Sequence, residues 1–130
     1  MHDYIYQEIT LNKISPDIYF AFLELYWPSF VQHEGHIFLK ETFSAEKFEG
    51  LKSQNENIGY WMNLVTIDPY FENDEDQEEK AAHLSKKLVD LWQAKLDKEY
   101  PELKFTVATL EDKEMGDYGL TFYQEKYAKK

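Results

Sequence analysis

The 130-residue sequence contains no cysteine. A disulfide framework, a thiolate metal site and a cysteine nucleophile are therefore excluded. The fold does not need such links, because a domain of this length buries roughly two thirds of its unfolded surface on folding. With 43% hydrophobic and 17% aromatic residues, we expect a single globular domain spanning residues 1–130.

Arginine is absent too. All 14 basic side chains are lysines, and 25 acidic side chains give a formal net charge of −11. Arginine is the residue that grips phosphates and base edges with paired hydrogen bonds. Since it is missing and the balance is acidic, we expect no nucleic-acid binding. The charge favours a basic partner instead.

The sequence also lacks long apolar runs and glycine-rich loops. No stretch approaches about 18 uncharged apolar residues, so we expect no membrane-spanning segment and no membrane partner. The start, MHDYIYQEITL, has neither the basic nor the apolar region of a secretory signal, and we expect a cytoplasmic protein. The five glycines are scattered and form no phosphate-binding loop or nucleophile elbow.

The first 28 residues predict a strand followed by a helix. Residues 4–9 alternate and are rich in tyrosine and isoleucine, which is typical of a strand. Ser15-Pro16-Asp17 is a typical helix start, and the apolar run 18–27 predicts a largely buried helix. Pro28 ends this helix, because the residue before a proline is pushed out of the helical region.

The middle of the chain predicts a strand over 36–42 and a short helix over 45–52. Ser44 is the expected N-cap of that helix. Residues 54–67 are ambiguous, because their apolar spacing favours a helix while the run LVTI within them is typical of a strand. We expect a helix there and keep the strand as the alternative.

The clearest element is a long helix over 74–99. Asp74 and Gln77 have the spacing of a capping box at its start, and Pro101 follows its end. Its apolar stripe comprises Ala81, Leu84, Leu88, Val89, Leu91, Trp92 and Leu96. Two strands, over 103–110 and 118–124, complete the chain.

This order of elements, β-α-β-α-(α)-α-β-β, predicts an α+β fold. Strands at both ends of the chain with helices between them favour a mainly antiparallel sheet of about four strands with the helices packed on one face. The order of strands in the sheet does not follow from the sequence.

His33, Glu34 and His36 form the most conspicuous polar cluster. Imidazole and carboxylate are suitable metal ligands, so the three residues are a candidate metal site. A zinc-protease helix needs two histidines four positions apart, whereas these are three apart and flank Gly35. The alternative is a polar turn in which Gly35 takes a positive φ, with the two histidines on opposite faces of the chain.

The acidic run FENDEDQEEK at 71–80 resembles the start of a calcium-binding loop. Gln77 stands where such a loop has glycine, and His83 where it has glutamate. We interpret the run as a solvated helix start, because acids near a helix N-terminus favour its dipole.

Ten tyrosines, nine phenylalanines and three tryptophans exceed what a core of this size requires. Tyr4, Tyr6 and Tyr123 are predicted to lie on the uncovered face of the sheet and to bind a partner. Trp27, Tyr60 and Trp61 are the candidate lining of a small-molecule pocket. A dimer or plain surface cover would explain the same aromatics.

The leading hypothesis is a non-catalytic acidic protein that binds a basic protein, as an inhibitor or immunity-type partner does. It requires no cofactor. Two alternatives stay open, a small metal-assisted hydrolase-type enzyme that uses His33, Glu34 and His36, and a small-molecule binding module. The oligomeric state stays open as well, with a homodimer as one alternative.

Overall fold

Five helices and two antiparallel sheets make up the part of the chain that this computed structural model describes, residues 1–54, 56–112 and 114–128. The predicted α+β class with antiparallel pairing is confirmed. The elements in chain order are α1 (His2–Leu11), α2 (Ile18–Tyr26), β1 (Phe30–His33), β2 (His36–Leu39), α3 (Ala45–Ser53), α4 (Ile58–Met62), β3 (Val65–Thr66), the 3-10 helix η1 (Asp68–Phe71), α5 (Gln77–Glu99), β4 (Phe105–Asp112), β5 (Asp117–Gln124) and the 3-10 helix η2 (Glu125–Tyr127).

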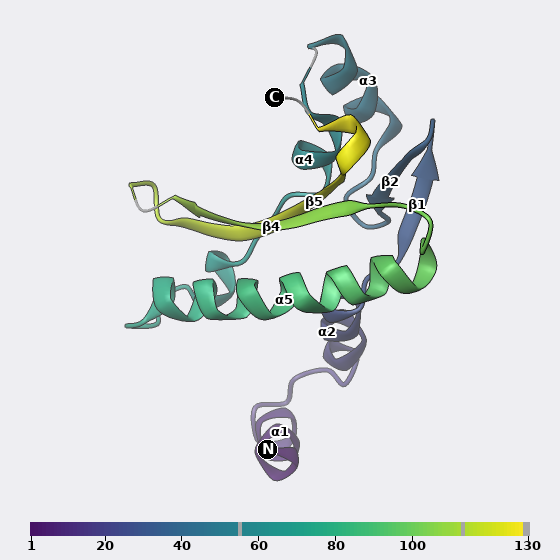
Figure 1. Cartoon of the computed structure of the whole chain (residues 1–130). Helices are drawn as coiled ribbons and strands as arrows, with labels where there is room; N and C mark the ends of the chain where they lie inside the picture. The colour runs from purple at the N-terminus through teal and green to yellow at the C-terminus, as the bar shows by residue number, and fades with distance from the viewer. Residues whose placement is uncertain (55, 113, 129–130) are drawn as a thin grey trace.

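β5 is the central strand of the larger sheet, whose order is β3-β5-β4 (Figure 1). β4 pairs with β5 over the whole length of both strands. β3 pairs with the other edge of β5, where Thr66 lies opposite Gly119. Only glycine permits this approach, because a Cβ at position 119 would lie 2.1 Å from the carbonyl oxygen of Val65.

Helices cover both faces of this sheet, and not one face as the sequence predicts. On one face Trp92 of α5 packs edge-on against Phe122, with 6.0 Å between ring centroids. On the other face the hydroxyl of Thr121 donates to the carbonyl of Tyr60 in α4 at 2.7 Å. Successive residues of a strand point to opposite faces, so α5 and α4 lie on opposite sides of β5, as Figure 1 shows.

Two hydrophobic cores result from this arrangement. The main core fills the space between α5 and the sheet, and its large members include Trp92, Leu88, Leu120 and Phe122. A smaller core of Phe38, Phe48 and Met62 joins the β1–β2 hairpin to α3 and α4.

Two side-chain amides connect the hairpin to the larger sheet. Asn63 is fully buried; its Oδ1 accepts from the Leu39 amide at 2.9 Å, and its Nδ2 donates to the carbonyls of Ile37 at 3.3 Å and Phe122 at 3.0 Å. The Ile37 amide donates to Oε1 of Gln124 at 3.0 Å. Within the described residues the two sheets share no backbone ladder, so these amides satisfy the edge of β2.

The predicted strand over 4–9 is wrong, because these residues belong to α1. A strand needs a neighbour to satisfy its backbone groups, whereas a helix satisfies them internally. The N-terminus lies away from the sheet in Figure 1, with no strand beside it. The prediction that the helix after Pro16 is largely buried is wrong too, since α2 contains no buried residue.

Several local predictions are confirmed. Ser44 caps α3 by accepting from the Lys47 amide at 3.2 Å, and α2 ends before Pro28. Residues 54–67 contain both predicted alternatives, the helix α4 and the short strand β3. β4 and β5 lie within two residues of their predicted bounds at each end.

Other boundaries differ for identifiable reasons. α5 begins at Gln77, and the predicted capping box does not form, because Asp74 instead accepts from the Asp76 amide at 2.9 Å and pairs with Lys80 at 2.8 Å. β2 ends at Leu39, and its partner β1 is a strand that the sequence did not predict.

Replacing Asn63 tests how the two sheets are joined. We expect Asn63→Ala to lower the free energy of unfolding by at least about 3 kcal/mol, because three buried backbone groups lose their partner. Chemical denaturation measures the difference. Asn12→Ala, at an exposed position in the N-terminal region, is the control and should change stability by less than about 0.5 kcal/mol. Equal effects of the two substitutions would contradict the bridging role.

Candidate functional site

The cluster His33, Glu34, Gly35 and His36 forms the tip of the β1–β2 hairpin. Glu34 and Gly35 have φ values of 48° and 82°, as a two-residue type I′ turn requires. The predicted positive φ of Gly35 is confirmed. His33 and His36 are directly opposed partners in the ladder, so their side chains share one face. The prediction that they point to opposite faces is wrong, because it treated the segment as a single strand.

Both histidines pack on aromatic rings. The His36 ring stacks on Tyr127 with 3.9 Å between centroids and lies 5.7 Å from Phe48, while His33 lies 4.7 Å from Phe48. Nε2 of His33 is 3.4 Å from a carboxylate oxygen of Glu34. No group of three histidine, aspartate or glutamate side chains among the described residues is arranged to hold a metal ion. The geometry gives both rings a packing role at the hairpin tip.

The candidate pocket residues Trp27, Tyr60 and Trp61 do not meet. Trp27 lies beside α5, with the Lys95 ammonium 5.9 Å from its ring centroid. Tyr60 and Trp61 contact each other on α4, with 5.0 Å between centroids. Because α4 and α5 lie on opposite faces of the sheet, the three rings do not line one pocket.

The three candidate partner-binding tyrosines also divide into two groups. Tyr4 and Tyr6 are 63% and 64% exposed on α1. Two positions along a helix correspond to about 200°, so their side chains point to opposite sides of α1. Tyr123 faces α4, with its ring 6.3 Å from that of Tyr60. A single tyrosine face on the sheet therefore does not exist.

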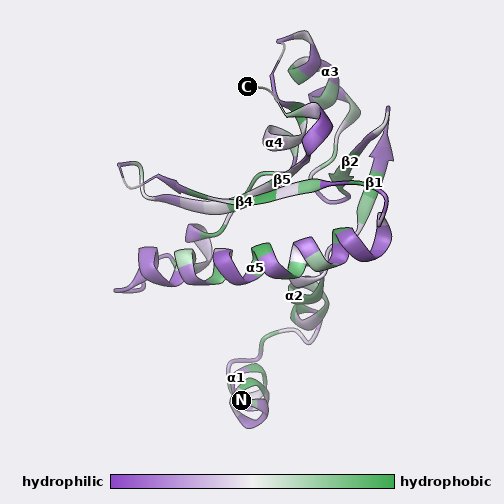
Figure 2. Ribbon diagram, in the orientation of Figure 1, coloured by the Kyte–Doolittle hydropathy of each residue, from purple (hydrophilic) through white to green (hydrophobic). Residues whose placement is uncertain are grey.

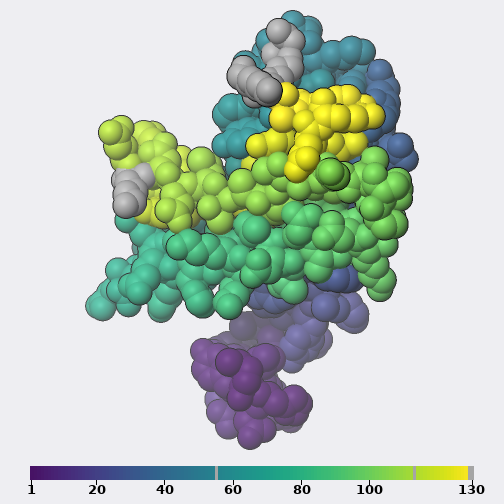
Figure 3. Space-filling model, in the orientation of Figure 1, coloured from purple at the N-terminus to yellow at the C-terminus, as the bar shows by residue number. Residues whose placement is uncertain are grey.

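The most unusual surface is the N-terminal arm, defined here as residues 1–27. No residue of the arm is buried, although α2 has the sequence IYFAFLELY. Figure 2 shows α2 in the colour of hydrophobic residues, and Figure 3 shows α1 standing away from the rest of the molecule. The exposed large hydrophobic residues of the arm are Met1, Tyr4, Ile5, Tyr6, Leu11, Ile14, Tyr19, Phe20, Phe22, Leu23 and Trp27.

The base of the arm is fixed to α5 by two side chains. Nε1 of Trp92 donates to the carbonyl of Leu25 at 2.7 Å, and Nζ of Lys95 donates to the carbonyl of Pro28 at 3.0 Å. Lys95 is only 9% exposed and also pairs with Glu99. These bonds satisfy the last carbonyls around the C-terminus of α2, where a helix has no internal donors. The arm is therefore anchored at one end and uncovered along the rest of its length.

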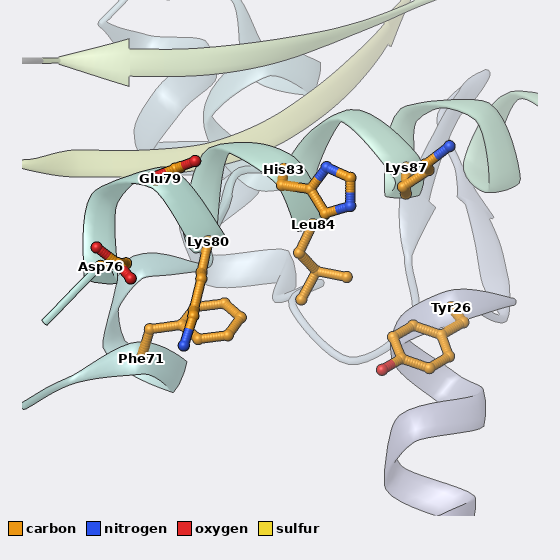
Figure 4. A pocket seen from close by; sticks show the side chains of 8 residues that line it. All are labelled: Tyr26, Phe71, Asp76, Glu79, Lys80, His83, Leu84 and Lys87. Atoms are coloured by element: carbon orange, nitrogen blue, oxygen red, sulfur yellow. The ribbon is translucent and has the colours of Figure 1, made fainter. Parts of the chain in front are cut away.

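A groove of about 650 Å³ runs beside the base of the arm, between α2, η1 and α5. Figure 4 shows Tyr26 of α2, Phe71 of η1 and a row of α5 side chains around it. The α5 residues carry both signs of charge, from Glu79 to Lys87. The groove thus joins the base of the arm, at Tyr26, to a mostly charged surface of the body.

The sequence contained the signal for this surface. An apolar run of this kind is expected to be covered, and a buried position in the protein's own core is the simplest prediction from the sequence. The sequence of residues 18–26 does not show whether this helix packs against its own chain or against another molecule.

Among the described residues, no helix has the length and apolarity to cross a membrane. Neither a known protein-family model, nor a curated protein, nor a solved structure matches this sequence or its fold.

The surroundings of His36 lead to a prediction about how the stability of the fold depends on pH. Burial lowers the pKa of His36 below 6.5; Glu34 opposes this shift, while Lys126, His33 and Lys52 reinforce it. As pH falls below 6.5, the unfolded chain takes up the proton first, so the native state loses stability until the folded-state pKa is passed. Thermal unfolding between pH 7.5 and 5.5 should therefore show wild type losing stability relative to His36→Phe. His83→Gln, on the exposed face of α5, is the control. Parallel pH profiles for wild type and His36→Phe would contradict the prediction.

Proposed function

We propose that this protein is a non-catalytic interaction module that binds a basic protein through its N-terminal arm, in the manner of an inhibitor or immunity-type protein. The observation that carries the proposal is α2, a nine-residue helix with one charged residue and no buried one. Exposed apolar surface of this extent is the usual mark of a protein-binding site.

The size of the arm fits one side of a protein interface. Its five exposed tyrosines and phenylalanines are 41% to 68% exposed. At ~200 Å² for each ring, these fractions amount to about 550 Å². The exposed leucines and isoleucines bring the total over all sides of the arm to the order of 800 Å², which is one partner's share of a standard interface. A partner has to enclose α1 to bury all of this area, because Tyr4 and Tyr6 point to opposite sides of that helix. Tyrosine and phenylalanine are also enriched in the core of interfaces.

The charge supports a basic partner. The net charge is −11, and the arm itself contains four acids, Asp3, Glu8, Asp17 and Glu24, against Lys13. The run Ile18–Leu23 is uncharged, so its contact with a partner costs no desolvation of charge. Apolar contact along α2 then provides affinity, while the acidic surroundings speed association with a basic protein and make it sensitive to salt.

Two exposed side chains on α2 test the proposal. Phe20 and Leu23 are 68% and 57% exposed, so the double variant Phe20→Ser/Leu23→Ser should fold normally. We expect it to bind the partner at least about tenfold more weakly, because buried aromatic anchors dominate interface energies. The measurement is affinity capture from an extract of the native cell, identification of the bound protein, and titration with that protein at low and high salt.

Met115→Ser is the matched control, since Met115 is 74% exposed in the β4–β5 loop and lies outside the arm. An identified partner that is acidic, or one that binds the double variant as tightly as wild type, would contradict the proposal. Light scattering over a range of concentrations tests the alternative occupant, a second copy. If wild type shows twice the mass of 15.6 kDa and the double variant does not, a second copy covers the arm and the assignment to a basic protein is wrong.

A further inference from the structure

A separate cavity of about 310 Å³ lies at the base of the arm, between α2, the end of β2 and β3. Trp92, which is 1% exposed, forms part of its wall, and Tyr70, which is 61% exposed, stands at its edge. Its polar residues include Glu24, Glu41 and Thr42. The cavity is distinct from the groove of Figure 4, which is lined by Tyr26 of α2, Phe71 of η1 and residues at and after the start of α5.

The charge in this cavity has one sign. Glu24 and Glu41 are its only charged lining residues, although the chain contains 14 lysines and the groove of Figure 4 is lined by two of them. The carboxylate of Glu24 is held in place, since it accepts from the Ser29 amide at 3.0 Å and from the Ser29 hydroxyl at 3.3 Å. Glu41 has no ion pair with any residue that the structure describes. The site therefore offers negative charge that the described part of the chain leaves uncompensated.

The remaining lining suits an organic cation. Trp92 supplies a closed part of the wall, since its indole N–H is bound to the Leu25 carbonyl and its side chain is only 1% exposed; the accessible aromatic ring of the lining is that of Tyr70, which is 61% exposed. Aromatic rings attract ammonium and guanidinium groups through their negative faces. A calcium ion is a poorer fit, because it takes six to eight oxygen ligands, more than two glutamates and a threonine supply without rearrangement.

We infer that this cavity binds the cationic end of a lysine or arginine side chain that a basic protein partner presents when it contacts the arm. The inference rests on the proposed function and deepens it. Ala21, Glu24 and Leu25 of α2 line the cavity, so a partner seated on the exposed face of α2 reaches the opening directly. A volume near 300 Å³ is at the small end of ligand pockets and suits one side chain.

The first test uses a small probe and the isolated protein. Titration with n-butylammonium, followed by NMR of the three tryptophan indoles, should give a saturable shift of the Trp92 signal, while n-butanol should give none. Glu24→Gln/Glu41→Gln should weaken butylammonium binding at least tenfold. Glu41 is exposed, so the single variant Glu41→Gln should fold normally, and it should weaken butylammonium binding measurably. Glu46→Gln/Glu49→Gln removes two exposed charges from α3 and is the control for net charge. A Trp92 signal that does not respond to butylammonium would overturn the inference.

The second test separates a protein side chain from a free amine. With the partner captured by the wild-type arm, Glu24→Gln/Glu41→Gln should weaken partner binding at least tenfold, while Glu46→Gln/Glu49→Gln changes it little. If wild type binds butylammonium but Glu24→Gln/Glu41→Gln still binds the partner as tightly as wild type does, the cavity is a site for small amines and the inference is overturned.

The two proposals fail in different ways. Phe20→Ser/Leu23→Ser should leave butylammonium binding intact, because neither residue lines the cavity. If this arm variant loses the partner and the glutamine variant does not, the proposed function stands and the cavity inference falls. If the arm variant keeps the partner while the glutamine variant loses it, the arm is not the contact surface and the proposed function falls.

Discussion

The carboxamide of Asn63 lies where two sheets meet without a shared ladder. It accepts from the Leu39 amide of β2 and donates to carbonyls of β2 and β5, with no exposure to solvent. Unpaired backbone groups on a buried strand edge would lower the stability of the fold, and the Asn63 side chain pairs most of those groups on β2. Because the hairpin is held in this way, Phe38 packs with Phe48 and Met62 into the second core. The position of β1, and of the chain that enters it from α2, follows from the same bridge.

The arm is exposed because the rest of the fold does not extend over α1 and most of α2. Trp92 and Lys95 of α5 bind the carbonyls of Leu25 and Pro28 and so fix the last turn of α2 against the main core. Beyond that point α2 and α1 have no layer above them, although α2 is among the most apolar segments of the chain (Figure 2). In our proposal a partner supplies the missing layer, and the cavity lined by Glu24 and Glu41 lies beside the same helix.

The elements predicted correctly are those whose signals are local. Ser44 and Pro28 act on their own helices, and the apolar stripe of α5 has a helical period that depends on no other segment. The failures depend on contacts between distant residues. Residues 4–9 alternate like a strand but have no strand to pair with, and the role of Asn63 requires backbone groups from residues 24 and 59 positions away. His33 and His36 were predicted as a cluster, yet only the hairpin register shows that they share a face and pack on Phe48. The cavity was not predictable, because Glu24 and Glu41 become neighbours of one space only through the fold.

The central claim is that the arm is uncovered in the isolated chain. Amide hydrogen exchange at a concentration where the protein is monomeric tests this claim most directly, because segments with few buried contacts open at low free-energy cost. The account predicts that amides of α1 and of the first turns of α2 exchange far faster than those of α5 and β5, and that α2 becomes protected when the partner binds. Protection of α1 and α2 equal to that of α5 in the monomer would show that the arm packs on the body, and would contradict the account.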